Sequence, residues 1–78
     1  MPDARERLVM CFEAVFPDLA PDRIADASLE TIAEWGSLAS VRLIAVIEEE
    51  FEIVIPIEDY GDMASFQGIH SYLLAKNA

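Results

Sequence analysis

The feature of this sequence that most constrains its fold is the run from Leu38 to Phe51, which contains neither glycine nor proline. A run of this length without a helix-breaking residue predicts one helix of about four turns. Gly36 ends any preceding helix, and the hydroxyl of Ser37 is expected to cap the new one by accepting a hydrogen bond from its first turn. The rest of the chain must therefore cover one face of this helix.

The apolar residues of this helix fall on two arcs when successive residues are placed about 100° apart. The wider arc is typical of a stripe that faces a core, and its members are Leu43, Ile44, Ile47 and Phe51. The narrower arc contains Leu38, Val41 and Ala45, which lie beside Arg42, Glu48 and Glu49. Folding needs only the wider arc, so we expect the narrower arc and its charged neighbours to form a surface on which a partner docks.

Three consecutive acids, Glu48, Glu49 and Glu50, lie near the C-terminal end of this helix. The helix macrodipole disfavours negative charge there by about 0.3–1 kcal/mol per residue. Two interpretations stay open, because a charge run can be a solvated face or part of a docking surface. Arg42 has no acid three or four residues away, so it either pairs with an acid between Ile57 and Asp62 or alters which partner docks.

A first helix is predicted near the start of the chain, where Pro2 to Glu6 has the pattern of a helix beginning. Asp3 can cap this helix, with Glu6 three residues later as in a capping box. The helical spacing places Leu8, Phe12, Val15 and Phe16 on its inner face, and the helix is expected to end at Pro17. The next segment, residues 17–34, suits a long ordered loop whose apolar residues Leu19, Ile24, Leu29 and Ile32 fold back onto the bundle.

The remainder of the chain predicts an extended connection and a last helix. Residues 52–57 are rich in isoleucine and valine, but a single such run has no strand to pair with. A single helical turn is expected from Ile57 to Tyr60. Ser65 is expected to cap a last helix whose inner face is Phe66, Ile69, Leu73 and Leu74, and Gly68 should weaken that helix by about 1 kcal/mol. Three main helices and one short helix predict an all-α four-helix bundle with a long first loop, in a single domain over residues 1–78.

The charge and cysteine content limit the classes of partner and of compartment. Fifteen acids against five basic residues give a net charge of −10, which argues against nucleic acid and favours partners with basic surfaces. No apolar run approaches the ~20 residues of a membrane span, and the start does not have the pattern of a signal peptide. The single Cys11 is expected to be a buried thiol. We therefore expect a cytoplasmic monomer that does not bind membranes.

The sequence offers little for catalysis or for metal binding. His70 is the only histidine, and no serine or cysteine stands at a spacing that suggests a catalytic dyad with it. The acids lack the spacing of a calcium-binding EF-hand loop, and no glycine-rich phosphate loop is present. Trp35 is expected to pack in the core or against the loop. We therefore expect neither a catalytic residue nor a metal site.

Several of these features together resemble the acyl carrier protein family. The matching features are Ser37-Leu38 at the start of a helix, the run Val41-Arg42-Leu43-Ile44, and Ile47-Glu48-Glu49-Glu50-Phe51 followed by Ile55-Pro56. The resemblance extends over most of the chain, because the flanking segments fall where the family places its other helices. The usual motif of the family is Asp-Ser-Leu, whereas Gly36 precedes the serine in this chain.

The resemblance implies an acyl-carrier-protein-like bundle in which Ser37 carries a covalent 4'-phosphopantetheine arm. The thiol of this arm would hold an acyl or aminoacyl group as a thioester and present it to enzymes of fatty-acid, polyketide or related biosynthesis. The implied partners are a phosphopantetheinyl transferase, an acyl- or aminoacyl-loading enzyme, and a downstream synthase or transferase. These partners would use a surface made of Gly36, Leu38, Val41, Arg42, Ala45, Glu48 and Glu49.

Two other functions stay open on the sequence. The chain could be an unmodified carrier-like acidic interaction module that uses the same helix only to dock on a basic surface. It could also be an acidic mimic that blocks a basic site on another protein. In neither case would Ser37 carry an arm.

Overall fold

The computed structural model describes residues 3–76, and the protein is all-α over this range. Its elements are the helices α1 (Ala4–Val15), α2 (Ser37–Phe51) and α3 (Phe66–Ala75) and the 3-10 helices η1 (Pro21–Asp26) and η2 (Ile57–Met63). Within these residues the only β-type pairing is an isolated bridge between Ser28 and Ser65. The predicted all-α bundle is confirmed. Pro2, with which the predicted helix beginning starts, lies outside the described residues.

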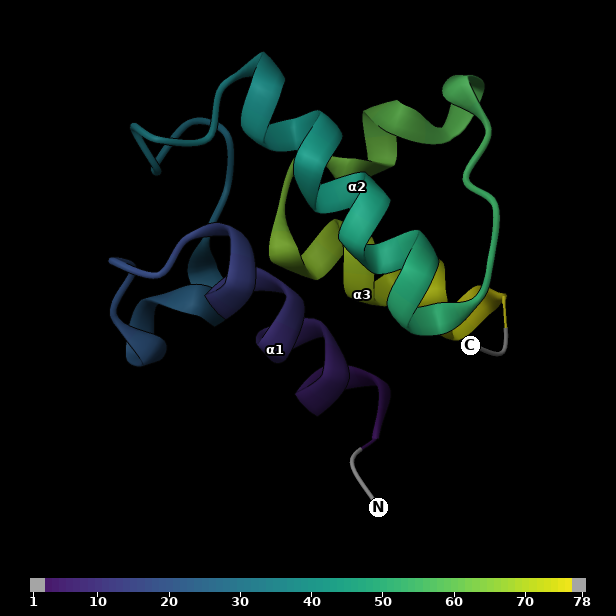
Figure 1. The fold of residues 1–78 in the computed structure, drawn as a ribbon, viewed down its shortest axis with the longest axis horizontal. Coiled ribbons are helices and arrows are strands. Elements are labelled where there is room, and N and C mark those ends of the chain that lie inside the picture. Colours follow the sequence, from purple (N-terminus) through teal and green to yellow (C-terminus); the bar gives the residue numbers. More distant parts are fainter. Residues whose placement is uncertain (1–2, 77–78) are drawn as a thin grey trace.

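The three α-helices surround one apolar core (Figure 1). α1 packs against α2 and α3, and α3 also packs against η1 and η2. The connection that contains η1 lies at one end of the bundle, and the connection that contains η2 lies at the other (Figure 1). No helix within residues 3–76 combines the length and the apolar character that crossing a bilayer requires.

α1 forms as its sequence predicts. The Oδ1 atom of Asp3 accepts a hydrogen bond from the backbone N–H of Glu6 at 2.8 Å, which satisfies one of the free donors of the first turn. The helix ends at Val15, before Pro17. The four predicted inner residues, Leu8, Phe12, Val15 and Phe16, are all buried.

α2 has the predicted faces but a different beginning. The wide-arc residues Leu43, Ile44, Ile47 and Phe51 are buried. The prediction that Ser37 caps the helix was wrong, because Ser37 is its first helical residue and Gly36 is the N-cap. Gly36 has an extended backbone, and its carbonyl oxygen accepts from the N–H of Ser40 at 2.9 Å. Since glycine has no side-chain acceptor, this helix start lacks a side-chain cap.

The first connection contains a helix that the sequence analysis missed. Pro21 lies at the start of η1, where its fixed φ suits a helix and its missing N–H costs nothing. Ile24 and Ile32 are buried and Leu19 packs partly against the core, as predicted. Leu29 does not fold back as expected and is 44% exposed, while its N–H donates to the carbonyl oxygen of Ala64 at 2.9 Å.

The second connection is extended at first, with Ile55 buried and Val54 exposed, as expected for a partly buried connection. η2 is longer than the single predicted turn and continues through Gly61 to Met63. Its packing on α3 is close, because a Cβ atom added at Gly68 would lie 2.7 Å from the carbonyl oxygen of Asp62. Glycine at this position therefore allows the two backbones to approach.

The last helix is capped as predicted, with the Oγ atom of Ser65 accepting from the N–H of Gly68 at 3.0 Å. Phe66, Ile69 and Leu73 are fully buried. The assignment of Leu74 to the inner face was wrong, since Leu74 is 55% exposed. One more residue of rotation carries the side chain beyond the buried stripe.

Candidate functional site

Ser37 lies at the first position of α2, and its side chain is exposed. In the described part of the chain its hydroxyl group makes no hydrogen bond. The first N–H groups of a helix have no partner inside the helix, and here no side chain caps them. An anion attached to Ser37 would therefore lie at the positive end of the helix dipole.

Trp35 holds the chain that leads into this helix. Its side chain is 2% exposed and packs edge-on against Phe12, with the ring centroids 5.4 Å apart, and against Phe16 at 5.7 Å. The predicted packing role of Trp35 is confirmed. Its indole N–H is buried and has no acceptor among the described residues. A large buried anchor thus lies two residues before Ser37.

The narrow arc of α2 is on the surface. Leu38 is 75% exposed and Val41 is 60% exposed, and Arg42 and Ala45 are also exposed. Arg42 makes no ion pair within residues 3–76, so the first of its two alternatives, pairing with an acid between Ile57 and Asp62, is not observed. The structure therefore leaves an apolar strip with one free cation along the outer side of α2.

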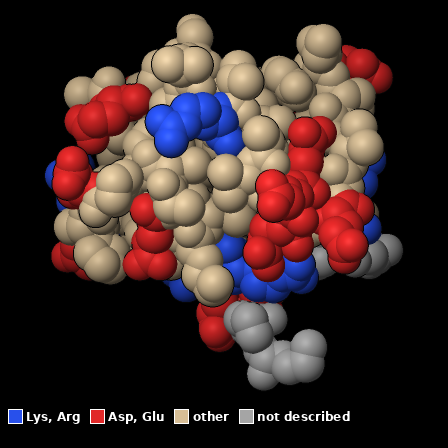
Figure 2. Space-filling view, viewed as in Figure 1, with Lys and Arg blue, Asp and Glu red and all other residues tan. Residues whose placement is uncertain are grey.

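The three acids at the end of α2 have three different environments. The Oε2 atom of Glu48 accepts from the N–H of Ile55 at 2.8 Å, and Glu50 is bound by Arg7. Glu49 is exposed. Acidic side chains gather over this end of the helix (Figure 2). Glu48 and Glu49 are the two acids assigned to docking. The carboxylate of Glu48 is bound to the backbone, whereas that of Glu49 has no hydrogen bond to the described backbone.

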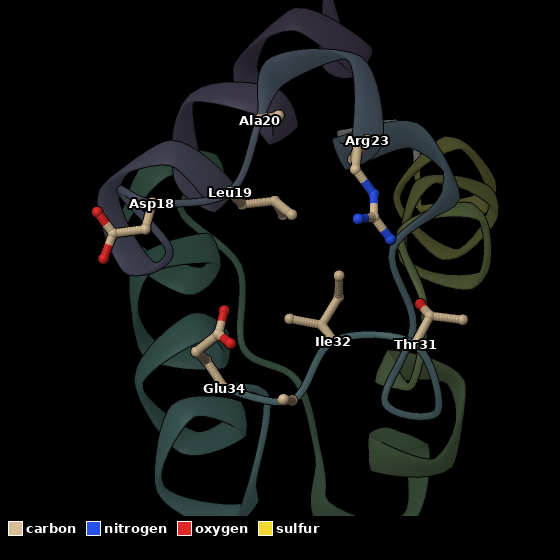
Figure 3. A pocket seen from close by; sticks show the side chains of 8 residues that line it. Asp18, Leu19, Ala20, Arg23, Thr31, Ile32 and Glu34 are labelled. Carbon is tan, nitrogen blue, oxygen red and sulfur yellow. The ribbon is translucent and has the colours of Figure 1, made fainter.

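A pocket that the sequence analysis missed lies in the first connection, shortly before Ser37. It has a volume of about 320 Å³ and lies between residues 18–23 and residues 31–34. Leu19 and Ile32 point toward each other across it, and the charged ends of Arg23 and Glu34 project toward it from opposite sides (Figure 3). Arg23 and Glu34 form no ion pair. The sequence predicted that Leu19 and Ile32 fold back onto the bundle. This prediction is the only sequence signal that could have indicated a pocket here.

The titratable groups Cys11, Tyr72 and His70 lie away from Ser37, and each is packed against its neighbours in the fold. Burial, and secondly the charge of Glu50, raises the pKa of the Cys11 thiol to about 11. Partial burial and the hydrogen bond to Asp59, 2.8 Å long, raise the pKa of Tyr72 to about 12. His70 lies half-buried on α3, with its ring 6.1 Å from that of Phe66. Among the described residues, no three His, Cys, Asp or Glu side chains gather where they could hold a metal ion.

No family model matches the chain, and no solved structure matches it. The likeness to acyl carrier proteins therefore rests on the residues of the chain alone.

Proposed function

We propose that this protein is an acyl carrier protein whose Ser37 holds a 4'-phosphopantetheine arm. The observation that carries the proposal is the exposed hydroxyl of Ser37 at the start of a helix that has no side-chain cap. Transfer of the arm from coenzyme A would join the Ser37 oxygen to phosphorus and release the nucleotide part of coenzyme A. The phosphodiester would then lie beside free N–H groups of the first turn, a favourable place for an anion.

The outer side of α2 supports the docking part of the proposal. Leu38 and Val41 are apolar, and neither is needed for the core, since both are more than half exposed. Apolar side chains surrounded by charge are common where a partner buries a small patch. Their place one and four residues after Ser37 would bring a docked enzyme next to the arm. The net charge of −10 favours transferases, loading enzymes and synthases with basic surfaces.

The carrier itself would not perform catalysis in this proposal. A phosphopantetheinyl transferase attaches the arm, a loading enzyme forms the thioester, and a downstream synthase or transferase removes the acyl or aminoacyl group. We place these reactions in the cytoplasm and the carrier in the monomeric state.

The test is intact mass spectrometry after incubation with a phosphopantetheinyl transferase and coenzyme A. Wild type should gain the mass of the arm, and Ser37→Ala should not. Ser40→Ala is the matched control, because Ser40 lies in the first turn of the same helix and should leave modification unchanged. An arm on the Ser37→Ala protein would refute the site.

A second candidate is an unmodified acidic interaction module that docks through the same side of α2. Gly36 favours it, because the family has an acid at this position and Gly36 offers no side-chain oxygen to the metal ion of a transferase. This candidate would be favoured if wild type stays unmodified with several transferases and yet binds a basic partner through Leu38 and Val41.

A further inference from the structure

We infer that the pocket between residues 18–23 and 31–34 receives the cargo of the arm and that this cargo is a small aminoacyl group. The inference rests on the proposed function, because the cargo reaches the pocket on the arm of Ser37. Glu34 lies three residues before Ser37, so one wall of the pocket belongs to the segment that leads into α2.

The chemistry of the pocket walls matches an aminoacyl thioester. Arg23 is a donor only and ionised Glu34 is an acceptor only, and their charged ends project toward the pocket from opposite sides (Figure 3). An aminoacyl thioester carries an ammonium group, which donates to a carboxylate, and a carbonyl oxygen, which accepts from a guanidinium group. A plain acyl thioester has only the carbonyl oxygen and offers no donor to the Glu34 carboxylate, which would stay bound to water.

The remaining part of the pocket suits the side chain of a small amino acid. Leu19 and Ile32 point toward each other between the two charges and provide an apolar surface (Figure 3). The volume of about 320 Å³ lies at the lower end of the range for ligand pockets. It accommodates a short aliphatic group more readily than a long acyl chain.

The open form of the pocket is consistent with a tethered occupant. Arg23 and Glu34 are both exposed, and exposed ion pairs are weak. A free amino acid would therefore bind poorly. A group on a flexible arm is present at an effective concentration on the order of millimolar, at which a pocket with a dissociation constant of about 1 mM is half occupied. The net charge of −10 also favours a cationic group over an anionic one.

The experiment compares two cargoes of nearly equal size on the same arm. Pantetheine analogues that carry alanyl or propionyl through an amide bond, which resists hydrolysis, are loaded onto Ser37, and the loading is verified by intact mass. Backbone amide chemical shifts are then recorded at pH values where the alanyl amine is protonated. The alanyl form should shift the amides of Leu19 and Ile32 relative to the unloaded arm, and the propionyl form should shift them much less.

Three variants then assign the effect to the pocket. Glu34→Gln should reduce the alanyl-induced shifts to the propionyl level, and Arg23→Gln should reduce them for both cargoes. Glu30→Gln is the control, because it removes an exposed acid of the same connection outside the pocket and should change nothing. Spectra of the unloaded variants show whether each is folded.

Each outcome separates the inference from the proposed function. Suppose that the arm attaches but the amide chemical shifts of the pocket do not change, or change equally for alanyl and propionyl. This outcome would refute the aminoacyl cargo and leave the carrier function intact. If wild type stays unmodified with every transferase tried, the carrier function is refuted, and the cargo assignment is refuted with it.

Discussion

Arg7 binds Glu50 through both the side chain and the backbone of the acid. The Nε atom of Arg7 donates to the Oε2 atom of Glu50 at 2.8 Å, and its Nη2 atom donates to the carbonyl oxygen of Glu50. The guanidinium group also lies over the ring of Phe51, 4.4 Å from the centroid. A cation from α1 thus closes the C-terminal end of α2, where the macrodipole favours positive charge.

We expect this pair to stabilise the bundle by a modest amount, because both side chains are about one-third exposed. A double-mutant cycle with Arg7→Gln and Glu50→Gln should give a coupling free energy of about 0.2–1 kcal/mol in urea unfolding. Arg7→Gln alone should cost more than the coupling, since it also removes the contacts with the Glu50 carbonyl and with Phe51. The same cycle between Arg5 and Glu50 should show no coupling, and an equal value there would contradict the assignment.

The effect of Gly68→Ala distinguishes helix propensity from packing. Propensity alone would stabilise α3 by about 1 kcal/mol. Because the new Cβ atom would lie 2.7 Å from the carbonyl oxygen of Asp62, we expect a loss of about 1–3 kcal/mol. Gly61→Ala is the control, since nothing lies within 4 Å of a Cβ atom there. A Gly68→Ala protein more stable than wild type in thermal unfolding would show that η2 does not pack closely on α3.

Gly36→Asp should stabilise α2 and, if Ser37 carries the proposed arm, should also speed the attachment of that arm. The position is open, and its φ of −97° suits any residue. An aspartate N-cap would exceed glycine by a few tenths of a kcal/mol in unfolding free energy. It would also place an acid before Ser37, as in the acyl carrier proteins that the sequence resembles. A time course of intact mass checks the rate, and Gly61→Asp, which adds the same charge elsewhere, should match wild type. Equal rates for all three proteins would mean that Gly36 does not limit modification.

Cys11 should make stability fall at alkaline pH. Its pKa is raised from 9.0 to about 11 in the folded protein, so between these values the folded state holds a proton that the unfolded state has lost. The protonated Cys11 thiol contributes fully to the free energy of unfolding below about pH 9, and this contribution is lost as the pH rises toward about 11. The difference in unfolding free energy between wild type and Cys11→Ala should therefore shrink over this range. A constant difference would indicate that the thiol titrates normally.

Local patterns account for the parts of the fold that could be predicted. The buried faces of α1 and α2 follow from helical spacing, and the caps at Asp3 and Ser65 follow from an acceptor three residues before a free N–H. Leu74 was misassigned because the stripe on α3 is narrower than its composition indicates. Ser37 was misassigned as a cap because the helix begins one residue earlier than its hydroxyl indicates.

The sequence by itself determined the three α-helices, their core residues apart from the misassigned Leu74, and the exposed arc around Leu38 and Val41, because helical periodicity is a property of neighbouring residues. Only the tertiary structure decided which residues that are far apart in the sequence come into contact. Arg7 meets Glu50 from 43 positions away, Gly68 lets η2 approach α3, and Leu19 and Ile32 come together to line a pocket. Such contacts depend on how the helices pack, and a local pattern contains no information about the partner that packing brings to a residue.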